Sequence, residues 1–166
     1  MKHNLVLLFV ATTLLLSCSS DKEDVVQEEN SIVGSWELTA LEIDDSTASD
    51  NEKYAQDILN FLSAMDCSIM TITFNADLSV ITEDSGNYLE INVNPGGTGL
   101  DIPCPTQKDT SVGSYMYEGG VLTYVDETDI ETTLNVTISG NTMTVSAAEL
   151  DFANFNDGGE LIFTKR

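Results

Sequence analysis

The stretch that decides the fold of this chain is LNVTISGNTMTVSA, which covers residues 134–147. Apolar and polar residues alternate on both sides of Gly140-Asn141, and glycine and asparagine tolerate the positive φ angles of a two-residue hairpin turn. A turn at this dipeptide places every apolar side chain of the stretch on one face of an antiparallel ribbon. The expected cross-strand pairs are Ile138 with Met143, Val136 with Val145, and Leu134 with Ala147.

A second hairpin is predicted at Gly119-Gly120 by the same reasoning. A two-residue turn there pairs Tyr117 with Leu122 and Tyr115 with Tyr124, so these four side chains also share a face. Because turn chemistry and facial pattern agree in two places, they are stronger evidence together than either is alone.

Further segments alternate in the same way, with one buried and one solvent-facing side. In the segment that begins at Trp36, the alternation shifts phase after Ala40, which predicts a β-bulge. About eight short strands joined mostly by hairpins predict an all-β, antiparallel up-and-down meander. Closure into a barrel would remove its exposed edges, so we expect a closed or nearly closed β-barrel with one inserted helix. The other expected strands are Met70–Phe74, Leu89–Val93 and Glu160–Lys165.

One helix interrupts the strands. Ser49 and Glu52 have the spacing of a capping box, in which each side chain accepts a hydrogen bond from the other residue's backbone N–H. The helix is expected to lie against the end or side of the sheet, just before Cys67. Residues 147–159 fit either a short helix or an apolar loop. The apolar residues at helical spacing are Tyr54, Ile58, Phe61, Leu62 and Met65.

The first eighteen residues resemble a bacterial lipoprotein leader. Leu5 to Leu16 is an apolar run broken only by threonines, and it is too short for a membrane-spanning helix, which needs about 20 apolar residues. The run ends in Leu15-Leu16-Ser17-Cys18, which resembles the lipobox, where a leader is cut before a cysteine that is then lipidated. The resemblance implies a signal peptide at residues 1–17 and acyl chains such as palmitate on Cys18. An ordinary secretory signal with an incidental cysteine is the alternative.

Residues 18–30 are predicted to form a disordered acidic tether, because they hold too little apolar surface to fold. The acidic start of this tether resembles the export signal of surface lipoproteins in one group of Gram-negative bacteria. It implies an outer membrane lipoprotein exposed at the cell surface, with a periplasmic location as the alternative. Residues 31–166 suffice for one domain with one core.

The mature chain is strongly acidic. It keeps five basic residues against 28 acidic ones, a formal charge of −23, and it has no histidine because His3 belongs to the leader. Nucleic acid is excluded as a partner, because phosphate contacts need the opposite charge. An anionic membrane surface also repels the chain, so contact with the membrane depends on the lipid anchor.

The available side chains argue against catalysis. Without histidine, neither a Ser-His-Asp or Cys-His arrangement nor a histidine-based zinc site can form. Carboxylate pairs could serve in a hydrolase, but no spacing singles out one pair. We therefore expect no enzyme, no cofactor and no metal site, although the acidic residues at Asp126, Glu127, Asp129 and Glu131 leave a calcium site open.

Cys67 and Cys104 are the two cysteines that remain beyond Cys18. Compartments outside the inner membrane are oxidising, so a disulfide between them is expected. Two unpaired buried thiols are the alternative.

Several short motifs together resemble the lipocalin-like domains of lipoproteins in the same bacterial group. Gly34-Ser35-Trp36 matches the Gly-x-Trp of the lipocalin first strand, and Phe74-Asn75-Ala76-Asp77 resembles a turn typical of these domains. The two glycine-containing hairpins follow in the family's order. The resemblance covers roughly residues 31–166 and implies a barrel in which Arg166 can lie across Trp36 in a cation–π contact.

The aromatic residues that would face the interior of such a barrel are the best ligand candidates, because each offers apolar area and some offer a hydroxyl group. The first hypothesis is a binding protein for a small hydrophobic ligand. The alternative is a filled barrel whose loops, at 44–52 and 94–109, bind a protein or glycan. For the tryptophan, a structural plug at one end of the core is also open. The expected ligand contacts are Trp36, Phe74, Tyr115, Tyr117 and Tyr124.

Overall fold

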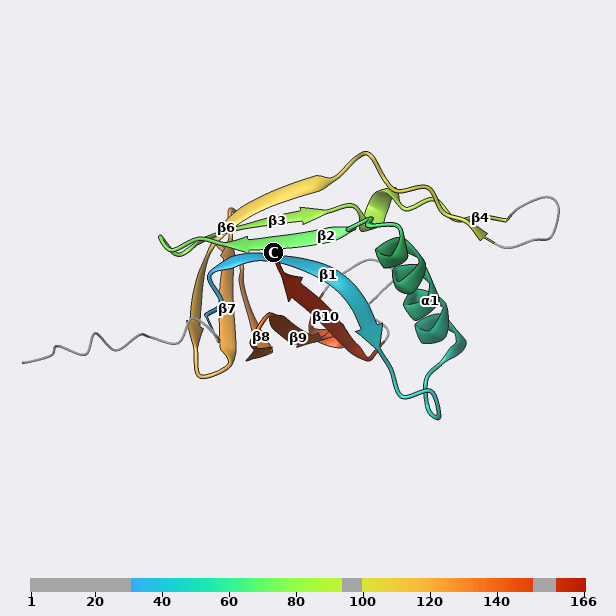
Figure 1. The fold of residues 1–166 in the computed structure, drawn as a ribbon. Coiled ribbons are helices and arrows are strands. Elements are labelled where there is room, and N and C mark those ends of the chain that lie inside the picture. Colours follow the sequence, from blue (N-terminus) through green and yellow to red (C-terminus); the bar gives the residue numbers. More distant parts are fainter. Residues whose placement is uncertain (1–30, 94–99, 151–157) are drawn as a thin grey trace, which may run out of the picture.

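The computed structural model describes residues 31–93, 100–150 and 158–166, and within them eight antiparallel strands close a barrel (Figure 1). The strand order around the barrel is β1-β10-β9-β8-β7-β6-β3-β2. This confirms the predicted all-β, up-and-down barrel with one helix. The barrel strands are β1 (Gly34–Glu42), β2 (Met70–Phe74), β3 (Ser79–Asp84), β6 (Asp109–Glu118), β7 (Val121–Asp126), β8 (Glu131–Ser139), β9 (Thr142–Ser146) and β10 (Glu160–Lys165).

The predicted leader, Cys18 and the tether lie outside the described residues. The same holds for residues 151–157, which belong to the segment predicted as a short helix or a loop. Within the described ranges, no helix is long and apolar enough to cross a membrane.

Both predicted hairpins are present, and all of their predicted residue pairs but one are confirmed. The expected pair of Leu134 with Ala147 is wrong, because β9 ends at Ser146 and the chain turns into a 3-10 helix, η3 (Ala147–Glu149). The Glu149 carboxylate then accepts the backbone N–H of Asn135 at 2.8 Å, so a side chain replaces the strand partner at this position.

The strand predicted at Leu89–Val93 is wrong. Strand β6 pairs directly with β3 along the whole length of β3, which leaves no gap in the barrel wall for a further strand. The chain after β3 forms a 3-10 helix, η2 (Gly86–Tyr88), whose first N–H donates to Asp84 Oδ1 at 2.6 Å. Only a short hairpin outside the barrel remains of the expected strand, and it extends away from the barrel (Figure 1). Its strands are β4 (Asn92–Val93) and β5 (Leu100–Asp101).

Strand β1 carries the predicted bulge. Its register against β10 shifts between Leu38 and Ala40, which leaves Thr39 as the extra residue and turns Leu41 toward the core. The bulge also receives the helix, because Ser63 Oγ donates to the Thr39 carbonyl oxygen at 2.6 Å. The phase shift that was visible in the sequence is therefore a docking point for α1 (Asp50–Ala64).

Helix α1 lies beside β1 (Figure 1) and begins with the predicted capping box of Ser49 and Glu52. Its expected apolar face is wrong in part: Tyr54, Phe61 and Met65 are 63%, 40% and 47% exposed. Hydrogen bonds from Gln56 and Ser63 to backbone carbonyl oxygens of β1 fix the rotation of the helix about its axis. A face of the helix next to the expected one is therefore buried. The buried residues of the helix are Ala55, Ile58, Leu59 and Leu62.

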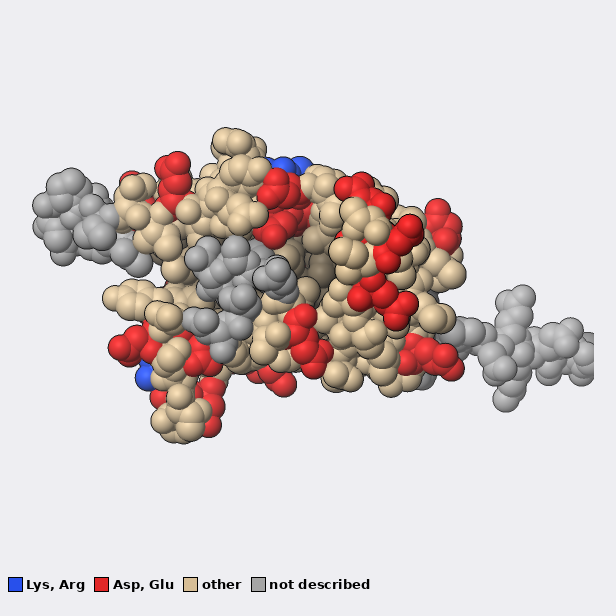
Figure 2. All heavy atoms as spheres, turned by 180° about the vertical axis from the view of Figure 1, so that it is seen from behind, with Lys and Arg blue, Asp and Glu red and all other residues tan. Residues whose placement is uncertain are grey.

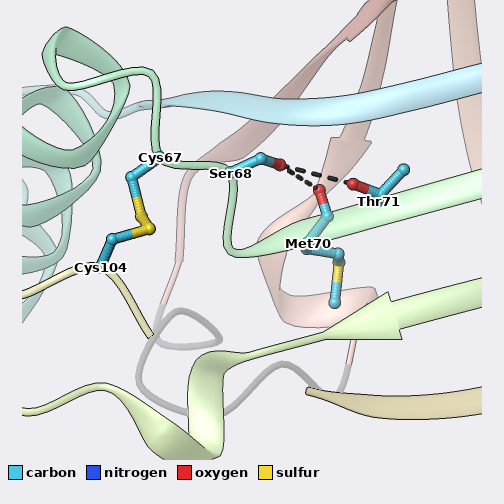
Figure 3. Close-up of a disulfide and its surroundings, with 5 residues drawn as sticks. All are labelled: Cys67, Ser68, Met70, Thr71 and Cys104. Carbon is cyan, nitrogen blue, oxygen red and sulfur yellow. Dashed lines mark hydrogen bonds between the residues drawn. A yellow bond between two sulfur atoms is a disulfide. The ribbon is translucent and has the colours of Figure 1, made fainter. Parts of the chain in front are cut away.

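The predicted disulfide between Cys67 and Cys104 is confirmed, with the two Cα atoms 5.8 Å apart (Figure 3). It joins the segment between α1 and β2 to the chain after β5. Ser68 Oγ donates to the Met70 carbonyl oxygen at 3.1 Å, so the segment next to the bridge is also held by a local hydrogen bond. The bridge therefore anchors the otherwise loosely paired residues 100–108 close to the start of β2.

The strands β9, β10 and β1 form what we call the packed wall of the barrel. Their inward apolar side chains interlock in register, and each of these apolar side chains is at most 3% exposed. This wall contributes half of the eight largest fully buried side chains of the described residues, and none of its residues lines the cavity on the other side of the barrel. The inward residues are Trp36, Leu38, Leu41, Met143, Val145, Leu161 and Phe163.

Candidate functional site

The opposite side of the barrel holds a half-open cavity of about 360 Å³. We call the strands around it, β2, β3, β6, β7 and β8, the cavity wall. Ligand pockets in proteins typically occupy about 300–1,000 Å³, so this volume suits one small molecule. Leu150 and the end of η3 complete the lining of the cavity.

Strand register arranges the lining on β2, β3 and β6 in three rows. The innermost row is apolar, with Phe74 opposite Val80, and the middle row has Ile72 opposite Thr82. The outer row has Met70 opposite Asp84, which in turn lies opposite Asp109 on β6. The rows therefore run from an apolar floor, through hydroxyl groups, to a carboxylate rim.

The strands β7 and β8 repeat this gradient. Leu122 is opposite Leu134 near the floor, and Tyr124 is opposite Thr132 farther out. The strands β7 and β8 thus show the same change from apolar to polar residues as β2, β3 and β6. An accidental gap between side chains would not be expected to show this agreement.

Gly113 determines where the Tyr124 ring lies. A Cβ atom at position 113 would overlap the Val125 carbonyl oxygen and the Tyr124 ring, so the ring occupies the space that a side chain on β6 would take. Tyr124 can lie across β6 and line the cavity only because this position is glycine. We regard Gly113 as a positioning residue of the site.

Three carboxylates form the rim: Asp84, Asp109 and Glu149. Tyr88 Oη donates to Asp109 Oδ1 at 2.7 Å, and Asn87 Nδ2 donates to Asp109 Oδ2 at 3.1 Å. These two hydrogen bonds lower the pKa of Asp109. All of the neighbours that the rim carboxylates use are neutral donors, so hydrogen bonding leaves their negative charge in place.

Asp84 differs electrostatically from its two neighbours. Burial raises its pKa, the Gly86 N–H lowers it, and the charge of Asp109 raises it further, with a raised pKa as the net result. The pKa of Glu149 is instead lowered by its hydrogen bonds from the backbone and side chain of Asn135. Asp84 is therefore the rim carboxylate whose charge the fold stabilises least.

The structure separates the five predicted ligand contacts into two groups. Phe74 and Tyr124 line the cavity, whereas Trp36, Tyr115 and Tyr117 are not part of its lining. Tyr115 contacts the floor residue Phe74: the two rings meet edge-on with 4.8 Å between their centroids. The Tyr115 hydroxyl donates to the Asn75 carbonyl oxygen at 3.0 Å.

Trp36 occupies the position of a plug. Its ring is fully buried, and Nε1 donates to the Ile32 carbonyl oxygen at 2.7 Å. The cation near its ring is Lys165, with Nζ 5.2 Å from the centroid, and not Arg166, which pairs with Glu37 instead. The difference arises because inward and outward positions alternate along β10, so that residue 165 shares the inward face with Phe163 and residue 166 does not.

The rim carboxylates and the hydroxyls of Thr82, Ser111 and Thr132 were not among the predicted site residues. For one of these residues, Asp84, the sequence contained a pattern that could have predicted its place in the site. Extending the β2–β3 turn outward from Phe74 and Val80 places Asp84 on the inner face by simple alternation. Glu149 had no such signal, because it lies in a 3-10 helix.

The acidic residues around Asp126 have a structural role in a turn. Asp126 Oδ1 accepts the N–H groups of Thr128 at 2.8 Å and Ile130 at 2.9 Å, which closes the loop between β7 and β8. Among the residues that the structure describes, no group of three or more His, Cys, Asp or Glu side chains is arranged to hold a metal ion.

The fold by itself does not identify the activity, because up-and-down barrels support many unrelated functions. The sequence motifs remain the basis of the lipocalin-like resemblance. Comparison of the chain with models of protein families, with curated proteins and with solved structures found no match.

Proposed function

We propose that this protein binds one small, mainly apolar molecule in the cavity of its barrel. The observation that carries the proposal is a half-open cavity of about 360 Å³ whose lining runs from an apolar floor, through hydroxyl groups, to a carboxylate rim. Binding sites for small molecules combine these features: apolar lining supplies the free energy, and a few polar groups fix the orientation. Burial of apolar ligand surface contributes roughly 25 cal/mol per Å².

The competing hypothesis, a filled barrel that acts only through its loops, requires a packed interior. The packed wall has that character, but the cavity wall does not. We therefore favour binding inside the barrel, with no catalytic step, since the mature chain lacks histidine and its rim carboxylates are engaged by neutral donors.

Presentation on a membrane completes the proposed function. The leader and its cysteine support an acyl anchor on Cys18, followed by a tether that leads to the barrel, on the cell surface or on the periplasmic face. Labelling cells with radioactive palmitate tests this part, with incorporation expected in the natural chain and lost in Cys18→Ser. Equal labelling of both chains, or no labelling of either, would refute the anchor.

Binding can be tested with the chain from Ser19 onward, which keeps every strand of the closed barrel and needs no detergent. The probe is N-phenyl-1-naphthylamine, a neutral dye that fluoresces in apolar surroundings. We expect saturable binding at a single site. Two variants on β6 form a matched pair: Ser111→Leu places a leucine in the cavity, and Val112→Leu places the same side chain at a position that is 49% exposed.

Ser111→Leu should weaken dye binding at least tenfold, and Val112→Leu should leave it unchanged. If the dye does not bind at micromolar protein, or if it binds Ser111→Leu as well as the natural chain, the proposal fails. Thermal unfolding of both variants confirms that they are folded.

A further inference from the structure

The rim of the cavity carries negative charge, and none of its carboxylates forms an ion pair within the described residues. Within residues 31–93, 100–150 and 158–166, the ion pairs are Lys108 with Glu83 and Arg166 with Glu37, and neither includes a rim carboxylate. Lys165, another described cation, lies over Trp36 and donates to a backbone carbonyl oxygen. On the face drawn in Figure 2, acidic side chains are spread over the surface and few basic ones appear.

The two rim aspartates face each other across neighbouring strands. Asp84 on β3 is directly opposite Asp109 on β6, and both line the cavity. Like charges placed directly opposite each other in an antiparallel pair destabilise the sheet. A cation bound between the two carboxylates would remove that repulsion. It would not have to displace a basic side chain, because neither carboxylate forms an ion pair within the described residues.

The apolar floor and the charged rim line the same half-open cavity. A molecule long enough to reach both would place its apolar part against Phe74, Leu122 and Leu134 and its head beside Asp84. A carboxylate head would meet three negative groups there, and a neutral head would leave their charges uncompensated. An ammonium head would both neutralise the charge and donate hydrogen bonds to the carboxylate oxygens.

We propose that the cavity selects amphipathic amines, with the apolar tail on the floor and the ammonium group held at the rim by Asp84 and Asp109. This inference rests on the proposed binding function and adds the chemical class of the ligand. Its distinguishing feature is a preference among molecules that share one tail. Hydrogen bonds between charged groups contribute enough to make that preference tenfold or larger.

The test compares nonylamine, nonanol and nonanoate as competitors of N-phenyl-1-naphthylamine, at low salt and below their aggregation concentrations. For the natural chain from Ser19 onward, we expect nonylamine to bind at least tenfold more tightly than nonanol, and nonanoate to bind most weakly. Asp84→Asn should bring the affinity for nonylamine close to the affinity for nonanol.

Glu118→Gln is the matched control, because it removes the same charge from the far end of β6, where the side chain is exposed and outside the cavity. It should keep the preference for the amine, which separates local recognition from attraction by the overall acidic charge. Equal binding of amine and alcohol, or an amine preference that survives in Asp84→Asn, overturns the inference and leaves the proposed function intact. If none of the three compounds displaces the dye and the dye itself does not bind, the proposed function fails as well.

Discussion

The packed wall and the cavity wall belong to one closed barrel, yet they use their inward positions differently. On β9, β10 and β1 these positions hold, apart from Lys165 near the end of β10, apolar side chains that are at most 3% exposed. On β3 and β6, the inward positions beyond Val80 hold threonine, two aspartates, serine and glycine. An eight-stranded barrel can be filled by large side chains or can hold one small ligand. The cavity therefore results from the small and polar residues at these inward positions, and not from the number of strands. The comparison teaches that stability and binding are assigned to different strands.

The sharpest way to break this comparison is to make the same substitution on both walls. Leu161→Ala on the packed wall should lower the free energy of unfolding by about 3–5 kcal/mol, because it leaves a void among close-packed neighbours. Leu134→Ala on the cavity wall should cost about 2 kcal/mol or less, because this side chain already borders empty space and makes fewer contacts. Urea unfolding of both variants measures the difference. Equal costs would mean that the two walls do not differ in packing.

The disulfide provides the next largest effect. Replacing both Cys67 and Cys104 by alanine should lower the free energy of unfolding by about 2–4 kcal/mol, because the bridge closes a loop between residues 37 apart in sequence. Since it anchors residues 100–108 close to the start of β2, dye affinity should fall together with stability, whereas Leu161→Ala should affect stability alone.

A reducing agent supplies the control for the disulfide. It should destabilise the natural chain by a similar amount and leave the double variant unchanged. If the reductant has no effect on the natural chain, the bridge does not contribute to stability and this prediction is wrong.

The packed wall was largely predictable from the sequence. Its strands alternate cleanly because every second residue must be buried, and the bulge in β1 appears as a phase shift between Ala40 and Leu41. Trp36 could also be assigned to the core, because a lone tryptophan at the start of a barrel strand most often fills it. Close packing therefore leaves a strong pattern in the sequence.

The cavity wall was harder to predict, for the same physical reason. Where the interior is hollow, inward positions such as Thr82 and Ser111 have no need to be apolar, and the alternation disappears. The apolar alternation of Leu89–Val93 then predicted a barrel strand in the wrong place, although β3 and β6 pair directly. The rotation of α1 was missed because hydrogen bonds to β1, which the helical pattern does not encode, determine it.

The turn that joins β2 to β3 offers a smaller test on the cavity wall. Leu78 has a φ angle of 67° and is 57% exposed, so it accepts a left-handed conformation without burying its side chain. Leu78→Gly should raise the free energy of unfolding by up to about 1 kcal/mol, because relief of the backbone strain exceeds the entropy that glycine adds to the unfolded chain. Leu78→Ala keeps the strain and should bring no such gain. A destabilised Leu78→Gly variant would show that the leucine side chain contributes more than its exposure indicates.

The smallest expected effect concerns stability at the rim. Because the pKa of Asp84 is raised in the folded protein, mainly by burial, folding favours its protonated form. That contribution to stability is fully present below the unfolded pKa of about 3.9 and is lost as the pH rises through the folded pKa. Asp84→Asn keeps an oxygen for the Gly86 N–H and carries no charge, so it should be more stable than the natural chain at pH 7, by less than about 1 kcal/mol because the carboxylate is only half-buried. The advantage should shrink toward pH 4, which paired urea titrations of the two chains can measure.

A destabilised variant at pH 7 would mean that the Asp84 charge is already compensated within the protein, and the case for a cationic ligand at the rim would lose its electrostatic basis. A gain at pH 7 together with the loss of amine selectivity would instead show that this wall of the barrel sacrifices stability for recognition, which the packed wall does not.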